Sequence, residues 1–189
     1  MYIEDRTFVK EDFTGNPLAK GEYENCSFIN CNFSDTDLSD VKFTECRFAG
    51  CNLSMAKLLK TAFNNVTFKD CKMLGLRFED CNPFGMVFSF DACILDHSSF
   101  FRAKIKKTAF KDSQLKEVDF TQSDISESVF ENCDLAGSTF DNTIMLKADF
   151  RSAFNYSIDP ESNRIKKAKF SLSGIAGLLD KYDISIDKI

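Results

Sequence analysis

The 189-residue sequence contains no tryptophan and is poor in histidine, proline and glycine, with one, three and eight residues respectively. The single histidine, His97, is expected to face outward between Leu95 and Phe100, so no nucleophile–base pair can be nominated. A glycine-rich loop that could cradle a phosphate is also missing. We therefore expect neither catalytic activity nor a bound cofactor.

Long apolar runs and a basic surplus are absent as well. No segment approaches the ~20 apolar residues that a membrane helix needs. The opening stretch, MYIEDRTFVKEDF, lacks a basic segment followed by an apolar one, so no signal peptide and a cytoplasmic location with reduced thiols are expected. The net charge of -5, from 29 acidic and 24 basic residues, argues against direct nucleic-acid binding.

Phenylalanine is abundant, with 21 copies, and it recurs at a spacing of five. A large, mostly apolar residue stands at every fifth position from Phe8 to Phe78; Pro83 interrupts the series and Phe88 resumes it. A register shifted by two then runs from Leu95 to Phe150 and returns at Ile165 and Phe170. A small residue usually lies two positions before each large one, and the other three positions are largely polar.

This pattern fits neither the period of two of a strand nor the 3.6 of a helix. Two inward residues followed by a gap of three predict a short extended piece and a corner. Four such corners close a coil of about 20 residues, and successive coils stack at roughly the 4.8 Å spacing of paired strands.

The units "CNFSD", "TDLSD", "CNLSM", "VDFTQ", "SDISE", "CDLAG" and "ADFRS" resemble those of the pentapeptide-repeat family, and the resemblance covers about residues 8–170. It implies an all-β solenoid, a right-handed quadrilateral β-helix of stacked coils with a short C-terminal helical cap. We expect this β-helix over residues 1–170 and the cap over 171–189.

All eight cysteines fall on the small inward site. Cys26 and Cys46 should stack on one face, and Cys31, Cys51 and Cys71 on another, as small buried apolar residues do. The alternative is a metal site, but zinc-binding pairs are usually two to four residues apart. The spacing of five favours core packing without metal.

The repeat breaks at three places. The first coil is imperfect and contains a predicted turn at Gly15–Pro17. The stretch at 81–95, which includes "CNPFGMVFSFDAC", is interpreted as a bulged corner with its own apolar cluster, or alternatively as a projecting recognition loop. A turn-rich excursion is expected at about 153–164.

The C-terminal stretch, SLSGIAGLLDKYDISIDKI, predicts a short helix capped by Ser171 or Ser173. Its helical spacing aligns one apolar stripe, and two later isoleucines alternate like a strand; the residues are Ile175, Leu178, Leu179, Tyr182, Ile184 and Ile186. This element is either a lid on the last coil or a homodimer interface, and the resemblance implies end-to-end dimerisation through the C-terminus.

Charge is banded along the chain. Between Glu117 and Met145 there is no Lys or Arg, and an acidic belt results from Glu117, Asp119, Asp124, Glu127, Glu131, Asp134 and Asp141. A basic band precedes it, made of Arg102, Lys104, Lys106, Lys107, Lys111 and Lys116.

The sequence is similar to the quinolone-resistance branch of the family, whose acidic rods are thought to mimic DNA. That resemblance implies binding of DNA gyrase or topoisomerase IV through the acidic belt and modulation of quinolone sensitivity. The alternative is a general interaction scaffold with another partner, because a shared fold does not establish a shared activity.

Overall fold

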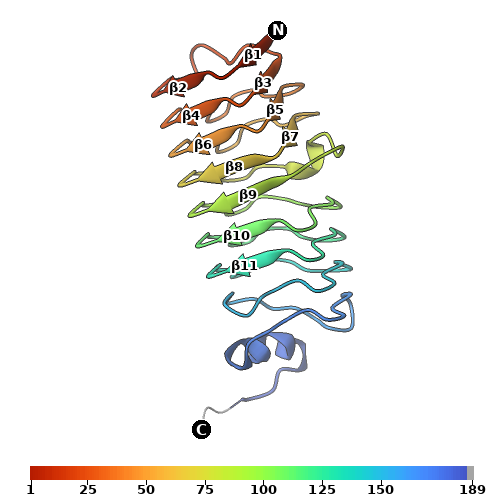
Figure 1. Ribbon diagram of the computed structural model, residues 1–189. Helices are drawn as coiled ribbons and strands as arrows, with labels where there is room; N and C mark the ends of the chain where they lie inside the picture. Colours follow the sequence, from red (N-terminus) through yellow and green to blue (C-terminus); the bar gives the residue numbers. More distant parts are fainter. Residues whose placement is uncertain (187–189) are drawn as a thin grey trace.

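Each coil of the chain pairs in parallel with the coil about twenty residues further on (Figure 1). The computed structural model describes residues 1–186. The chain winds from the N-terminus at one end of a rod to the C-terminal segment at the other. This is the parallel β-solenoid that the period of five predicted.

Short strands form two parallel sheets on neighbouring sides of the rod. The four-stranded sheet contains β1 (Tyr2–Glu4), β3 (Glu22–Glu24), β5 (Lys42–Thr44) and β7 (Ala62–Asn64). The seven-stranded sheet contains β2 (Thr7–Val9), β4 (Ser27–Ile29), β6 (Arg47–Ala49), β8 (Val66–Lys69), β9 (Phe88–Asp91), β10 (Ala109–Lys111) and β11 (Val129–Glu131). Isolated bridges such as Asn32↔Asn52 and Asp37↔Lys57 join the coils on the other two sides.

Phenylalanine rings stack along the inside of the seven-stranded sheet. Neighbouring rings are nearly parallel, with centroids 4.6–5.5 Å apart, in the column Phe8, Phe28, Phe48, Phe68, Phe90, Phe110, Phe130, Phe150 and Phe170. A second column contains Phe78, Phe100, Phe120 and Phe140. The excess of phenylalanine therefore reflects one packing site repeated in successive coils. Each buried ring contributes about 1.5–3 kcal/mol.

The corners between sides use the left-handed backbone conformation at about every fifth residue. Asn25, Asn30, Asp35 and Asp40 have φ of 49°, 54°, 56° and 61°. Short polar side chains tolerate this conformation better than others because they can hydrogen-bond locally. The corner geometry thus explains the polar residues that follow each large inward site.

The repeat is interrupted between β8 and β9. Val66 pairs with Phe88 and Phe68 pairs with Phe90, an offset of 22 residues, whereas Phe90 pairs with Phe110 at an offset of 20. The predicted shift of two is therefore confirmed, but its predicted position was wrong. Phe88 occupies a small site, and the extra residues lie before it, where Pro83 cannot donate a backbone hydrogen bond to the next coil.

The cysteine prediction is confirmed in its packing: all eight thiols are buried and free. Cys51 stacks against Cys31, whose N–H donates to Cys51 Sγ at 3.4 Å, and Cys51 donates from Sγ to the carbonyl of Phe28 at 3.3 Å. Burial raises the pKa of Cys46 to about 12. Within residues 1–186, no cluster of three or more His, Cys, Asp or Glu side chains is arranged to hold a metal ion.

The stretch at 153–164 does not lengthen its coil, because Ile144 still bridges to Arg164 twenty residues later. Tyr156 and Ile158 turn inward and are buried. The chain then forms the 3₁₀ helices η2 (Leu172–Leu178) and η3 (Asp180–Tyr182); an earlier one, η1 (Phe78–Asp80), precedes the register break. No helix in the described part of the chain is long and apolar enough to cross a membrane.

Candidate interaction surfaces

The acidic belt encircles the rod and does not form one stripe. Asp119 and Asp141 flank the Phe120 and Phe140 side of the solenoid. Glu131 ends β11 on the seven-stranded sheet, which is the opposite side of a four-sided coil. Glu127 lies at a corner, with φ of 61°. A partner that contacts all four carboxylates must therefore grip the rod from two sides.

Lysines of the basic band reach one coil along the rod and neutralise two belt acids. Lys106 Nζ lies 3.0 Å from Asp124, and Lys116 Nζ lies 3.4 Å from Asp134. Burial raises the pKa of Asp124, but hydrogen bonds from Ser126 and Lys106 outweigh it and hold the pKa below its ordinary value. These two carboxylates are mostly covered and already paired, so they are poorly placed to attract a partner.

A third belt acid has a titratable neighbour: Glu117 lies 3.2 Å from Nδ1 of His97. The remaining four, Asp119, Glu127, Glu131 and Asp141, form no ion pair within residues 1–186. Three of these are exposed, and Asp119 is half-buried. The belt therefore presents fewer free charges than its sequence indicates.

The C-terminal segment combines a lid with an exposed apolar surface. Ser171 caps η2 by accepting a hydrogen bond from the Gly174 N–H at 3.2 Å. The sequence predicted a cap at Ser171 or Ser173, and the first of the two is confirmed. Leu178 packs against the core, and Leu179 is half-buried. Leu178 thus helps to cover the end of the rod.

The other apolar residues of the segment face solvent: Ile175, Tyr182, Ile184 and Ile186, together with Leu172. The predicted strand at Ile184 and Ile186 was wrong for residues 183–186, which are irregular and have no ladder partner among the described residues. Asp183, with φ of 50°, turns the backbone just before them. Residues 187–189 of the predicted cap lie outside the described residues.

Polar contacts attach this segment to the last coils. The Ile158 N–H donates to the Gly177 carbonyl at 2.8 Å, which joins η2 to the stretch that precedes it. Lys181 Nζ lies 2.7 Å from Asp159 and 2.6 Å from Glu161. Charge pairs that the sequence analysis did not anticipate therefore fix the position of the cap. In the sequence, only the acidic residues of "DPES", Asp159 and Glu161, indicated that such pairs could form.

Two sequence profiles match the chain. The one described as "Pentapeptide repeat region" covers residues 18–83, and "Pentapeptide repeats (8 copies)" covers residues 119–154. The chain belongs to the pentapeptide-repeat family. Comparison of this pentapeptide-repeat protein with curated protein sequences finds no match.

Solved structures of the family resemble this pentapeptide-repeat protein. A trypsin-treated variant of QnrB1, described as a plasmid-mediated fluoroquinolone resistance protein, is 19% identical with a TM-score of 0.50, and the match covers 100% of both chains. HetL, described as a pentapeptide-repeat protein involved in heterocyst differentiation regulation from the cyanobacterium Nostoc sp. strain PCC 7120, is 16% identical with a TM-score of 0.39; the match covers 88% of this chain and 86% of HetL. At these identities the similarity to QnrB1 shows the fold alone.

Proposed function

We propose that this protein binds a type II topoisomerase, DNA gyrase or topoisomerase IV, by presenting its acidic belt in place of DNA, and that it thereby modulates quinolone sensitivity. The observation that carries the proposal is the arrangement of the four unpaired belt acids on opposite sides of the rod. A DNA duplex likewise presents phosphates around its circumference. Complementary charge of this kind steers association and selects partners.

The exposed apolar surface of the C-terminal segment extends the proposal to a homodimer. Ile175, Ile184 and Ile186 have no partner within the described chain that covers them, and all lie at one end of the rod. Joining two copies at this end would place both acidic belts near the centre of a longer rod. The doubled belt would match an enzyme surface built for a continuous duplex.

The competing function is a protein scaffold for an unrelated partner, and a specific observation favours it. Lys106 and Lys116 neutralise two of the seven belt acids, and the basic band lies directly beside the belt. Such a band would repel an enzyme surface that is itself basic. The scaffold reading therefore predicts binding that does not depend on Glu127 or Glu131.

The test is a supercoiling assay with purified gyrase, with and without ciprofloxacin, in which this protein is titrated. We expect rescue of supercoiling in the presence of the drug, or inhibition in its absence. The variant Glu127→Lys with Glu131→Lys should abolish the effect. The matched control is Asp40→Lys with Glu45→Lys, two exposed acids outside the belt. Lysine already occupies such corners at Lys60 and Lys107, so folding should be retained.

No effect of the wild-type protein on either topoisomerase would reject the proposal in favour of the scaffold. Equal loss in the belt variant and in the control would also reject it, because net charge alone would then explain the activity.

A further inference from the structure

A column of backbone hydrogen bonds runs along the side of the rod that begins with β1, and within residues 1–186 it is interrupted once. In this column each N–H donates to the coil before it at 2.9–3.0 Å, in the pairs Lys42 to Gly21, Ala62 to Val41, Asn82 to Thr61 and Asp124 to Ala103. Lys104 occupies the intervening position. Its N–H and its C=O form no backbone hydrogen bond within the described chain.

Pro83 explains the interruption. At its position in the next coil, a backbone N–H donates to the coil that follows, as Ile105 does to the Asp124 carbonyl at 3.0 Å. Proline has no N–H, so the carbonyl of Lys104 has no donor below it. The chain bulges outward after Pro83 and returns where the Val87 N–H donates to the Phe63 carbonyl at 2.9 Å.

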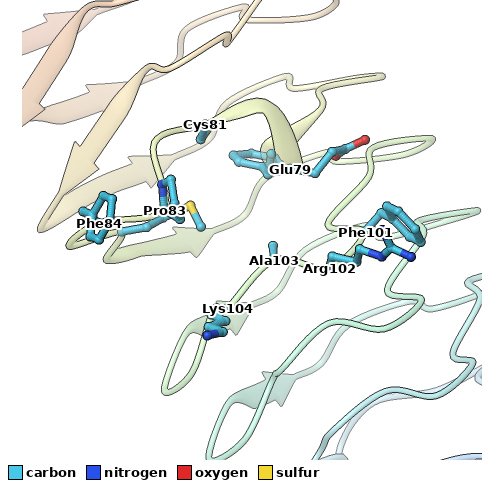
Figure 2. Close-up of a pocket in the computed structure, with 10 residues that line it drawn as sticks. Glu79, Cys81, Pro83, Phe84, Phe101, Arg102, Ala103 and Lys104 are labelled. Carbon is cyan, nitrogen blue, oxygen red and sulfur yellow. The ribbon is translucent and has the colours of Figure 1, made fainter.

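The bulge leaves a groove of about 650 Å³ between the two coils. Figure 2 shows Pro83 and Phe84 on the loop along one edge, and Ala103 and Lys104 on the coil along the other. The side chain of Phe84 is 83% exposed, and Met86 and Phe101 add further apolar surface. The groove therefore combines an open strand edge with apolar walls.

The charge of the groove is positive. Arg102 and Lys104 line it, and neither forms an ion pair within residues 1–186; Arg102 donates from Nε to the Gln122 amide at 2.7 Å. The one acidic lining residue, Glu79, is already paired with Arg77 at 3.2 Å. By contrast, Lys106 and Lys116 outside the groove each contact an aspartate of the belt.

We propose that this groove binds an extended, acidic segment of a partner protein, which adds to the Lys104 edge as a short strand. Backbone addition requires a ligand that offers a donor and an acceptor at strand spacing, which a peptide does and a phosphodiester chain does not. An apolar side chain of the segment packs against Pro83 and Phe84, which lie side by side in Figure 2. Flanking Asp or Glu side chains meet Arg102 and Lys104.

Amide hydrogen exchange tests the open edge in the full-length protein. The Lys104 amide should exchange much faster than that of Lys42, its counterpart three coils earlier on the same side, which is bonded to Gly21. If the two amides are equally protected in the free protein, the edge is closed and the proposal fails.

A displayed library of random nine-residue peptides, selected against the wild-type protein, tests the ligand. Recovered sequences should carry an apolar residue flanked by Asp or Glu. Labelled synthetic copies should bind about tenfold more weakly to Arg102→Glu with Lys104→Glu, as expected for the loss of charge-assisted contacts. The matched control is Lys107→Glu, which should leave binding unchanged: Lys107 belongs to the same band, lies outside the groove and forms no ion pair within residues 1–186.

Peptide binding should also protect the Lys104 amide from hydrogen exchange. Methylation of the central backbone nitrogen of the peptide should weaken the binding. Thermal melts establish that each variant folds. If the Arg102→Glu with Lys104→Glu variant does not fold, Arg102→Gln with Lys104→Gln is tested in its place. The proposal is overturned if the selected peptides lack acidic residues or bind all variants equally. It is also overturned if a labelled single-stranded oligonucleotide binds the wild-type protein more tightly than these peptides do, and if this binding is abolished in the Arg102→Glu with Lys104→Glu variant.

Discussion

Phe88 fills the part of the core that Pro83 vacates. Pro83 stands where a large inward residue is due above Phe63, but it is exposed on the bulge. Phe88 takes a small site five residues later and is buried, with its ring centroid 5.4 Å from Phe78 and 6.4 Å from Phe63. A large residue on a small site thus compensates for a missing one on a large site.

Replacing Phe88 with alanine should lower the free energy of unfolding by about 3–5 kcal/mol, because the cavity would lie inside the phenylalanine columns. Phe84→Ala is the control: its side chain is exposed, so it should change stability by less than about 0.5 kcal/mol. Urea unfolding followed by circular dichroism measures both. A loss below 1 kcal/mol at Phe88 would contradict the compensation.

The eight thiols should not react with Ellman's reagent in the native protein, because all are buried and burial raises the pKa of Cys46 and of Cys133 to about 12. Thiolate, which is the reacting form, is then scarce at these two positions at pH 8, and burial keeps the reagent away from all eight. In urea all eight should react at once. Rapid labelling of any cysteine before unfolding would show that its coil opens locally.

A β-branched residue at a corner should destabilise the rod. Lys107 has φ of 59°, so Lys107→Val should cost about 1–2 kcal/mol, whereas Lys107→Gly should cost little or nothing. Lys57→Val is the matched control, since Lys57 lies in an extended bridge where valine is favoured. Thermal unfolding of the three variants gives the comparison, and equal melting temperatures for the two valine variants would refute the corner argument.

Asp149 should make stability depend on acid pH. Arg151 donates to it at 2.8 Å and, with the Arg151 N–H and Lys169, lowers the pKa of Asp149 to about 2. Because the folded pKa is below the unfolded value of about 4, this stabilisation is complete above pH 4 and is lost as the pH falls toward 2.

Asp149→Asn should therefore cost about 1 kcal/mol at pH 7 and almost nothing at pH 2. Asp70→Asn serves as the control, because Asp70 lies at an exposed corner and forms no ion pair within the described part of the chain. Unfolding curves recorded across this range measure the difference. If the loss of stability in Asp149→Asn does not change with pH, it does not arise from the charge of the carboxylate.

The C-terminal surface should hold two copies together. Ile175→Glu with Ile184→Glu should convert a dimer of about twice 21.4 kDa into a monomer in light-scattering chromatography. Val9→Glu places the same charge on an exposed apolar residue at the opposite end and should leave the dimer intact. A wild-type protein that is monomeric at tens of micromolar would rule out this interface.

The fold was predictable because one packing rule repeats in nearly every coil. The spacing of Phe28, Phe48 and Phe68 is sufficient to place all three in one column. Where a backbone effect competes with this packing rule, the spacing alone does not predict the position of a residue. The period assigns Phe88 to a large site, but the missing N–H of Pro83 moves the bulge ahead of it.

The candidate surfaces were only partly predictable. The sequence shows the belt acids but not that Lys106 and Lys116, eighteen residues before their partners, neutralise two of them. Such pairs depend on coil stacking and on long flexible side chains. Likewise, helical spacing aligns Leu178 with Ile175, yet only Leu178 reaches the core and Ile175 stays exposed, because the end of the rod covers just part of η2.

The interruption at Pro83 also has a consequence for folding. In a linear stack, stability is approximately a sum over coils and the interfaces between neighbours, so cooperativity is transmitted only from one coil to the next. The interface beside Lys104 lacks hydrogen bonds that the same column makes elsewhere. Under denaturant or mechanical load, the rod should therefore separate into two blocks at this junction, each melting as its own unit.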